Sequence, residues 1–444
     1  MRAAAQAELR RRLPGQATAG DLEREALRMA REVFGPALGD ELTARAAEAP
    51  RAGRCAECGH RVRLVASGRV RHLTGMLGEC CYGRAYLHCG RCGRGYAPGD
   101  QLLGIGPGAW LPSLQQAAAR LGVEVSFGQA AAALTEAVHL PVPEEDIRRV
   151  TEGIGAVAEA EQQAAVQRVR RGEERPGRAV SETLVLAVDG CMVHVDKAWH
   201  EVKVAACAPC GPDWEDDPDT RGRRLALGRQ RFAVGLEDAE HFWHRAYALA
   251  VEQGLGRGVK RAAVLGDGAA WIWRGAHDFL GVPGVDVIEI VDLWHARQHV
   301  WGVAQAMFPD HMACQAWAEP LCAALLREGA PPVLAALRAA APQGAEAEKA
   351  VRLALQYFGD NVERMRYPEF SALGLPVGSG MVEGACKMVV QARAKGAGMR
   401  WRALGVQAVA SLRAVHRSGQ WARFWDRAPQ MRRPASRALA PAAA

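Results

Sequence analysis

The segment SETLVLAVDGCMVHV, residues 181–195, has the apolar pattern of a buried β-strand but carries an acidic residue, Asp189, at its middle. A buried carboxylate without a partner is energetically costly, so it requires a compensating group such as a metal ion. The alternative is that Asp189 and Gly190 begin a turn, because Asp-Gly is a common turn dipeptide. The rest of the chain has to distinguish the two interpretations.

Length and charge restrict the class of protein. The 444 residues suffice for two to four domains with apolar cores, and 56 Lys and Arg against 49 Asp and Glu give a net charge of +7. Most of the cations are arginine, whose planar fork binds phosphate well, although an Arg-rich composition can also reflect genomic base composition. The chain shows neither a signal-peptide pattern nor an apolar run long enough for a membrane span. We therefore expect a soluble cytoplasmic protein without a membrane partner, whose twelve cysteines are thiols or metal ligands.

Changes in composition divide the chain into segments. We predict a helical N-terminal segment (1–50), a zinc-ribbon-like module (51–100), a helical DNA-binding region with a linker (101–175), an α/β core in two parts (181–305 and 376–425) separated by a helical region (306–375), and a disordered tail (426–444).

Two Cys-x-x-Cys pairs indicate a metal site. CAECGH supplies Cys55 and Cys58, and LHCGRCGRGY supplies Cys89 and Cys92. Four thiolates spaced in this way can hold one structural Zn²⁺ tetrahedrally, and the intervening segment reads as a β-hairpin. Unrelated buried thiols or a redox pair are the alternatives. The adjacent Cys80 and Cys81 are not expected to be ligands. A third pair, Cys207 and Cys210, has no partner pair nearby and is better explained as a turn between strands.

A candidate helix-turn-helix occupies residues 126–155. An Ala- and Leu-rich helix, a turn with Pro141 and Pro143, and a second helix with an acidic first turn follow one another. Any helical hairpin has the same layout. If the segment does bind DNA, Arg148 and Arg149 are the expected phosphate contacts.

The order of elements after residue 181 predicts the fold of the core. Strands at 184–195, 200–207 and 231–237 precede a helix, and two further strands at 261–269 and 285–295 alternate with helices. Three consecutive strands followed by alternating helix and strand is the order of an RNase H-like fold, a mixed five-stranded sheet with helices. In that fold the middle of the first strand and the end of the fourth lie side by side, and those positions hold Asp189 and Asp267.

A third acid follows a Gly-Ser-Gly turn in GSGMVEGACKMVVQARAKGAGMRW, where Glu383 falls in the first turn of a late helix. Helix-dipole complementarity alone also favours a glutamate there. Three carboxylates at these elements can together hold two Mg²⁺ or Mn²⁺ ions roughly 4 Å apart, the arrangement used to cleave and transfer phosphodiesters.

The motifs AVDG, LGDGAAWIW, VDLWHARQHV and the segment around Glu383 resemble DDE transposases of bacterial insertion sequences, in particular the Kra-type group. The cysteine module is similar to the zinc-binding region of that group, and the resemblance extends over about 55–425. It implies Asp189, Asp267 and Glu383 as catalytic metal ligands, and 306–375 as a helical insertion in the fold. It also implies cut-and-paste or copying chemistry on terminal inverted repeats in the bacterial nucleoid, by a homodimer or larger assembly on double-stranded DNA.

Two further sets of residues accompany the three acids. In VDLWHARQH, the side chains of Asp292, His295 and His299 can share one helical face, although a plain helix start explains the same pattern. The resemblance implies that Asp292 and His295 line the active site as accessory residues. Basic residues after Glu383 fit DNA contact or a solvated helix face; they are Lys387, Arg393, Lys395, Arg400 and Arg402.

Two other functions remain open on the sequence alone. One is a non-catalytic DNA-binding protein of transposon origin, or a zinc-ribbon regulator, although such a protein has no chemical need for all three acids. The other is an RNase H-like nuclease that acts on DNA junctions or RNA hybrids. Metal-dependent nicking separates a transposase from the first, and joining of a 3′-hydroxyl to target DNA separates it from the second.

Overall fold

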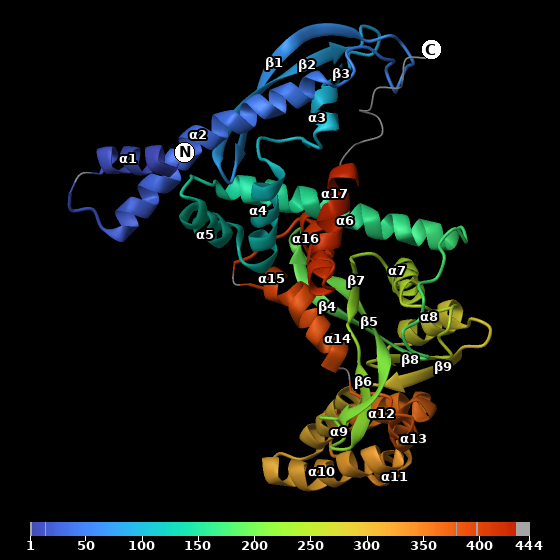
Figure 1. The fold of residues 1–444 in the computed structure, drawn as a ribbon. Coiled ribbons are helices and arrows are strands. Elements are labelled where there is room, and N and C mark those ends of the chain that lie inside the picture. Colours follow the sequence, from blue (N-terminus) through green and yellow to red (C-terminus); the bar gives the residue numbers. More distant parts are fainter. Residues whose placement is uncertain (1, 14, 379, 397, 432–444) are drawn as a thin grey trace. The chain divides into compact units, whose positions relative to one another are not determined.

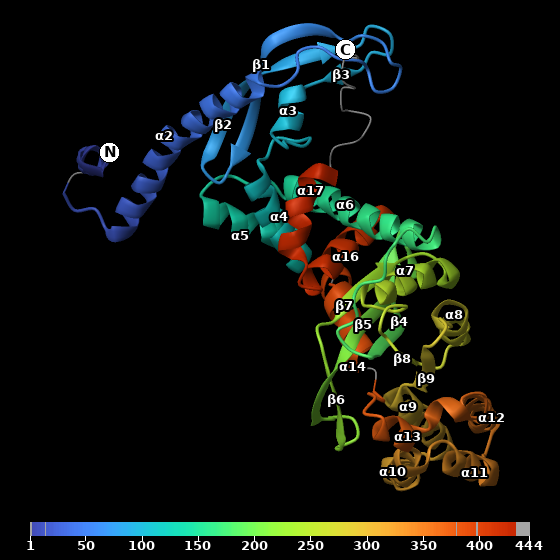
Figure 2. The same ribbon diagram turned by 45° about the vertical axis from the view of Figure 1, so that its right-hand side comes forward.

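A computed structural model describes residues 2–13, 15–378, 380–396 and 398–431 of the chain. These residues divide into two compact units, one formed by the chain up to Val157 together with the part from Ala422 onward, and one formed by Ala158–Trp421 (Figures 1 and 2). Among the described helices, none combines the length and the apolar character needed to cross a membrane.

The first unit contains one antiparallel sheet and several helices. The strands β1 (Arg63–Gly75), β2 (Gly78–His88) and β3 (Gly95–Tyr96) pair in that order, so the predicted hairpin between the two cysteine pairs is confirmed. The helices of this unit are α1 (Arg2–Arg12), α2 (Ala19–Ala47), α3 (Pro98–Leu102), α4 (Pro112–Glu124), α5 (Phe127–Val138) and the first half of α6 (Glu144–Arg170).

The backbone of helix α2 packs directly against the backbone of strand β2. A Cβ atom added to Gly35 would come within 2.7 Å of the carbonyl oxygen of Glu79, and one added to Gly39 within 2.3 Å of the carbonyl oxygen of Cys81. Only glycine permits this approach of a helix to a strand. Leu73 and Cys80 are buried in the apolar core next to α2 and β2. The burial of Cys80 in this core agrees with the expectation that it is not a metal ligand.

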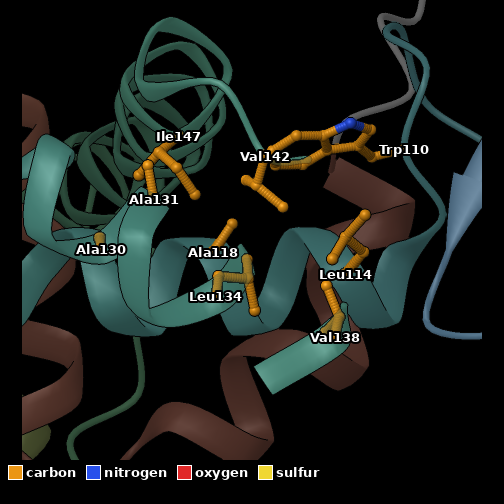
Figure 3. Packing of buried hydrophobic residues seen from close by; sticks show 9 residues of the cluster. All are labelled: Trp110, Leu114, Ala118, Ala130, Ala131, Leu134, Val138, Val142 and Ile147. Atoms are coloured by element: carbon orange, nitrogen blue, oxygen red, sulfur yellow. The ribbon is translucent and has the colours of Figure 1, made fainter. Parts of the chain in front are cut away.

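Helices α4, α5 and α6 enclose a separate apolar core (Figure 3). Ser126 begins α5 with a capping box, since its hydroxyl accepts from the backbone of Gln129 while the Gln129 side chain accepts from the backbone of Ser126. Leu114 on α4, Leu134 on α5 and Ile147 on α6 are all buried in this cluster. The predicted pair of helices is therefore present, and it packs as part of a three-helix cluster.

The second unit is built on a mixed sheet. Its strands are β4 (Thr183–Val195), β5 (Ala198–Asp216), β6 (Arg223–Leu227), β7 (Arg231–Gly235), β8 (Arg261–Gly266) and β9 (Asp286–Val291). The order is β6-β5-β4-β8-β9, and β7 also pairs with β5. Strand β5 is antiparallel to β4, β6 and β7, whereas β4, β8 and β9 are parallel. The predicted combination of a mixed sheet with helices is confirmed at this level.

Two sequence-based expectations about β5 were wrong. The described sheet has six strands and not five, because β5 continues to Asp216 and its far end pairs with β6. Cys207 and Cys210 consequently lie in the buried part of this strand and not in a turn. The Cys-x-x-Cys pair without a partner pair suggested a turn, but a register shift after Cys210 shows that the strand accommodates an irregularity and continues.

Helices complete the second unit. They are α7 (Ala239–Glu252), α8 (Ala270–Leu280), α9 (Leu293–Met307), α10 (His311–Glu328), α11 (Pro331–Ala339), α12 (Ala345–Asp360), the 3₁₀ turn η1 (Val362–Met365), α13 (Tyr367–Ala372), α14 (Gly380–Ala385), the π-helix η2 (Cys386–Gln391), α15 (Ala392–Ala394) and α16 (Ala403–Arg417). Helices α9–α13 gather beside the end of β9, and the chain then returns to pack α14 against β4 and β5 (Figures 1 and 2).

The end of the described chain is helical. Helix α17 (Trp421–Met431) includes residues 426–431, which the sequence assigned to a disordered tail. The buried aromatic residues Phe424 and Trp425, directly before the predicted tail, give the helix an apolar face, and the helix continues past them to Met431. The rest of the predicted tail, 432–444, lies outside the described residues.

A buried ionic cluster joins three helices of the second unit. Arg245 on α7 is only 3% exposed and donates to Glu159 on α6 at 2.5 and 2.9 Å and to Glu237. Glu159 also accepts from Ser411 at 2.7 Å and from Gln407 at 2.9 Å, both on α16. Every charge in this cluster has an opposite partner, which is the condition under which buried ions are tolerated.

Replacement of Arg245 by alanine should therefore destabilise this unit strongly. The substitution leaves two carboxylates without their cation, and breaking a buried pair costs about 3–5 kcal/mol. Hydrogen exchange of the amides in α7 and α16 measures the loss directly. The exposed Arg338→Ala on α11 is the matched control, with an expected change below about 0.5 kcal/mol. If the amides of α7 and α16 were equally protected from hydrogen exchange in Arg245→Ala and Arg338→Ala, the ionic cluster would not be what holds the helices together.

Candidate functional site

The two cysteine pairs meet at one end of the β1–β2–β3 sheet. Sγ of Cys55 lies 3.4 Å from Sγ of Cys92, and Sγ of Cys58 lies 3.5 Å from Sγ of Cys89. The four sulfur atoms all lie within 4.8 Å of one another. Each pair sits in a tight turn in which a backbone amide returns to the first cysteine, from Gly59 to Cys55 and from Gly93 to Cys89. Both turns end in a glycine with positive φ.

This cluster has the chemistry of a structural zinc site. Four thiolates around Zn²⁺ with bonds near 2.3 Å are separated by about 3.8 Å, close to the sulfur separations found here. Tyr96 donates its hydroxyl to Sγ of Cys55 at 3.0 Å, and this hydrogen bond lowers the pKa of the Cys55 thiol to about 6. A thiolate is the form that binds metal. The cluster could thus hold a metal ion such as Zn²⁺, whereas the exposed Cys81 contacts His72 instead.

Replacement of Cys58 by serine should abolish zinc binding. We expect one equivalent of zinc in the purified chain and close to none in the variant, because a hydroxyl is a poor zinc ligand. Elemental analysis by mass spectrometry measures the ratio, with Cys81→Ser as the control that keeps its zinc. Chelation should also increase hydrogen exchange in β2 and β3, since metal binding contributes to folding in such modules. A metal-free wild-type chain would exclude the zinc assignment.

Asp189 and Asp267 occupy matching positions on neighbouring parallel strands. The last paired residues of β4 and β8 are Ala187 and Leu265, and Asp189 and Asp267 each follow two residues later in the sequence. Asp189 is inside β4, so the sequence-based alternative of a turn at Asp189-Gly190 is wrong. Asp267 directly follows β8, and its carboxylate accepts from the amide of Ala269 at 2.9 Å before α8 begins.

The environment of Asp189 makes its charge unfavourable. Burial is the main cause that raises its pKa, and the nearby negative charge of Asp267 raises it further. The amide of Gly190, 2.7 Å from the carboxylate, acts in the opposite direction. A divalent cation would offset the unfavourable charge of Asp189, and the hard oxygen atoms of the two carboxylates suit Mg²⁺ or Mn²⁺. The donor set of these two residues therefore fits the metal that the sequence suggested.

Glu383 does not complete a preformed metal site. It lies in α14, which packs against β4 and β5, but its carboxylate accepts from Lys387 one turn further on, at 2.5 Å. Both side chains of this pair are more than half exposed. Over the described residues, the four cysteines are the only set of three or more Cys, His, Asp or Glu side chains whose ligand atoms come within 4.8 Å of one another. The structure thus brings the two aspartates together and leaves Glu383 apart from them.

Asp292 and His295 form a hydrogen-bonded pair beside the two aspartates. Asp292, only 1% exposed, begins α9 by accepting from the amides of Trp294 and His295, and it also contacts Nδ1 of His295 at 2.9 Å. This hydrogen bond raises the pKa of His295, and the charges of Asp267 and Asp189 contribute in the same direction. His295 is therefore held where an acidic site favours its protonated form.

His299 and Tyr357 extend this region towards α12. Their rings stack with centroids 3.7 Å apart, and burial lowers the pKa of His299. The Tyr357 hydroxyl donates to the backbone carbonyl of Asp267 at 3.0 Å. Tyr357 was not identified from the sequence, because it is about 90 residues away from Asp267 and no motif surrounds it.

Two cysteines near Asp189 were also missed. Cys386 is buried and donates to Oδ2 of Asp189 at 3.7 Å. A hydrogen bond with Cys191 and burial both raise the pKa of Cys386, so it remains a neutral thiol. The spacing in the sequence contained the necessary signal. Cys191 follows Asp189 by two residues on one strand face, and Cys386 follows Glu383 by three residues on one helix face.

The predicted DNA-contacting residues occupy different environments. Arg148 is paired with Glu145 and Glu152, and Arg149 with Asp146, all on α6. Arg393 is 3% exposed and its guanidinium lies 4.8 Å from the centre of the Trp401 ring, so it supports the loop after α15 from inside. Three of the others are exposed, as a phosphate contact requires; they are Lys395, Arg400 and Arg402.

Comparison with known proteins adds no assignment: no protein-family model matches this chain, and no curated protein matches it significantly.

Neutralising Asp189 should stabilise the metal-free protein. Because its pKa in the folded chain lies above the unfolded value of 3.8, the folded chain binds the proton more tightly. This contribution to stability is complete below pH 3.8 and is lost as the pH rises through the folded-state pKa. In EDTA at pH 7, Asp189→Asn should therefore slow hydrogen exchange in β4 relative to wild type, with the difference disappearing at the acid end of the profile.

Addition of Mn²⁺ should make hydrogen exchange in β4 slower in the wild type than in Asp189→Asn, because the ion binds the carboxylate of the wild type and cannot bind the amide of the variant in the same way. Asp278→Asn on α8, an exposed position, is the control and should behave as wild type throughout. If Asp189→Asn exchanged faster than wild type in EDTA, the strain attributed to the carboxylate pair would be wrong.

Proposed function

We propose that the chain is a DDE-type DNA transposase that binds the terminal inverted repeats of an insertion sequence and performs metal-dependent strand cleavage and strand transfer. The observation that carries this proposal is the pair Asp189 and Asp267, half-buried at matching positions of adjacent parallel strands. A catalytic metal pair requires adjacent carboxylates of this kind, and the raised pKa of Asp189 is typical of a functional site.

The strand order supports an RNase H-like core. Without β6, the sheet reads β7-β5-β4-β8-β9, in which the first three strands in chain order are antiparallel neighbours and the last two are added in parallel beside the first. This is the order expected from the sequence. Under the proposal, α10–α13 form a helical insertion between β9 and the helix that carries Glu383.

Asp189 and Asp267 would hold the divalent ions, and His295 would lie beside them. Such ions lower the pKa of an attacking water molecule or 3′-hydroxyl and neutralise the charge that develops on the phosphate. Asp292 fixes the orientation of the His295 ring through Nδ1, which leaves Nε2 to face a substrate or a water molecule. Cys386 donates to one oxygen of Asp189 and so orients that carboxylate.

Glu383 would join the site after release from Lys387. The pair is exposed and spaced i, i+4, so breaking it costs only about 0.5 kcal/mol. A divalent ion at the aspartates offers Glu383 a stronger partner, and a DNA phosphate offers one to Lys387. The same exposed pair is the observation that favours the second candidate, a transposon-derived DNA-binding protein without catalysis, because in the present arrangement the third carboxylate is not at the site.

DNA and a second copy of the chain would be the partners. The exposed Lys395, Arg400 and Arg402 follow the helix of Glu383 and are available for phosphate contacts. Arg148 and Arg149 would have to exchange their carboxylate partners for phosphate. Since transposition joins two element ends, the active form would be a homodimer or larger assembly on double-stranded DNA.

Asp267→Asn should abolish cleavage while DNA binding persists. We expect the wild-type chain, with Mg²⁺ or Mn²⁺, to cut a labelled duplex that carries the end of its element and to join the 3′-hydroxyl to a second DNA. The rate in the variant should fall by roughly 10³-fold, about 4 kcal/mol of transition-state stabilisation. Asp278→Asn is the control and should cut at the wild-type rate.

The other outcomes identify the alternatives. Binding of the end without cutting in any divalent ion would replace the transposase with a non-catalytic DNA-binding protein. Cutting without joining of the 3′-hydroxyl would instead indicate an RNase H-like nuclease.

A further inference from the structure

The segment 374–378, shortly before α14, is held between the β5–β6 hairpin and the start of α9. On one side, the amide of Leu225 on β6 donates to the carbonyl of Gly374 at 2.9 Å. On the other side, the amide of Leu293, the first residue of α9, donates to the carbonyl of Val377 at 2.9 Å. Gly374 has a φ of +72°, and a Cβ atom added to it would lie 2.7 Å from the Leu225 side chain. The segment is therefore fixed to the hairpin and to α9 through its backbone.

The side chain of Asp219 joins the same three elements. Asp219 lies in the turn between β5 and β6, and its Oδ1 accepts from Nε1 of Trp294 on α9 at 2.6 Å. Its carboxylate also lies against the backbone of Gly378, where an added Cβ atom would overlap it. One carboxylate thus contacts the residue two positions after Asp292 and a buried glycine five positions before Glu383.

The turn that carries Asp219 is held by its own hydrogen bonds. Asp217, only 2% exposed, accepts from the amide of Asp219 at 3.1 Å and from the Thr220 hydroxyl at 2.8 Å. The amide of Asp217 in turn donates to the carbonyl of Gly222 at 2.9 Å. Aspartate side chains that accept from the backbone two residues later stabilise turns in this way. The position of Asp219 is therefore set by the hairpin and does not depend on α14.

We propose that Asp219 is a positioning residue that anchors the segment 374–378, so that Glu383 can reach the carboxylate pair from a fixed point. The inference rests on the proposed function, because it concerns the transfer of Glu383 to a metal held at Asp189 and Asp267. With the anchor in place, the change is confined to the helix that carries Glu383. Without it, the preceding segment has to be ordered when the metal binds, and this ordering weakens the binding.

The test measures the concentration of Mn²⁺ that gives half of the maximal protection of the β4 amides from hydrogen exchange, in the full chain. Asp219→Ala and Trp294→Phe should each raise it roughly tenfold, the usual effect of removing a group that supports a metal ligand. Asp219→Asn keeps an oxygen that accepts from Trp294 and should restore the wild-type value. Asp213→Ala, at an exposed position of β5, is the matched control and should also behave as wild type.

A second comparison separates positioning from a general loss of stability. In the Glu383→Gln background, Asp219→Ala should not change the Mn²⁺ concentration any further, because both substitutions act on the same ligand. In EDTA, Asp219→Ala should also increase hydrogen exchange in α14, whereas Asp219→Asn should not.

Three results would overturn the positioning role. They are an unchanged Mn²⁺ concentration in Asp219→Ala, an equal loss in Asp219→Asn, and an effect of Asp219→Ala that persists in the Glu383→Gln background. If the wild-type chain still cuts DNA in these cases, the proposed function stands without this role. Mn²⁺ binding that depends on Asp219 in a chain that never cuts DNA would support the role and reject the transposase. A wild-type β4 that gains no protection from Mn²⁺ would overturn both.

Discussion

The second unit is organised around the cost of placing two carboxylates on neighbouring parallel strands. Burial raises the pKa of Asp189, and the charge of Asp267 raises it further. The surrounding groups limit this cost and do not remove it: the Gly190 amide and the Cys386 thiol donate to Asp189, and the Ala269 amide donates to Asp267. A buried charge of this kind is unfavourable for the fold, and under the proposed function it would be offset by a bound cation.

The sequence predicted the strands and the two aspartates because local patterns determine them. An apolar run with one acid, and an acid directly after a strand, are visible without any knowledge of tertiary structure. The length of β5 and the position of Cys207 and Cys210 were not predictable in this way. The Cys-x-x-Cys pair without a partner pair suggests a turn locally, while pairing of β5 with β6 and β7, which is a non-local interaction, keeps the strand extended. Tyr357, which contacts Asp267 from a distant segment, was missed for the same reason.

In the cysteine module, the local sequence determines more of the geometry than contacts between distant segments do. Its two Cys-x-x-Cys turns are specified by a few adjacent residues, and the sheet between them only has to bring the turns together. Metal coordination at the four cysteines would then replace a large apolar core as the source of stability for a small module. The prediction from spacing alone therefore agreed with the geometry here. The DNA contacts predicted for Arg148 and Arg149 compete with ion pairs to Glu145, Glu152 and Asp146, whose i, i+3 and i, i+4 spacing is already present in the sequence.

Two small energies bear on the arrangement around Glu383: the cost of the π-helical segment that follows α14 and the strength of the ion pair between Glu383 and Lys387. Directly after α14 the helix changes to the π-helical segment η2, whose first residue, Cys386, donates to Asp189. π-Helical segments cost stability and are often found at functional sites. Against that cost, the exposed pair of Glu383 and Lys387 contributes only about 0.5 kcal/mol. Under the proposed function, a divalent ion at Asp189 and Asp267 would offer Glu383 a second partner, and a DNA phosphate would compete for Lys387 at the same time. Metal and DNA would therefore favour the same change, the transfer of Glu383 from Lys387 to the carboxylate pair.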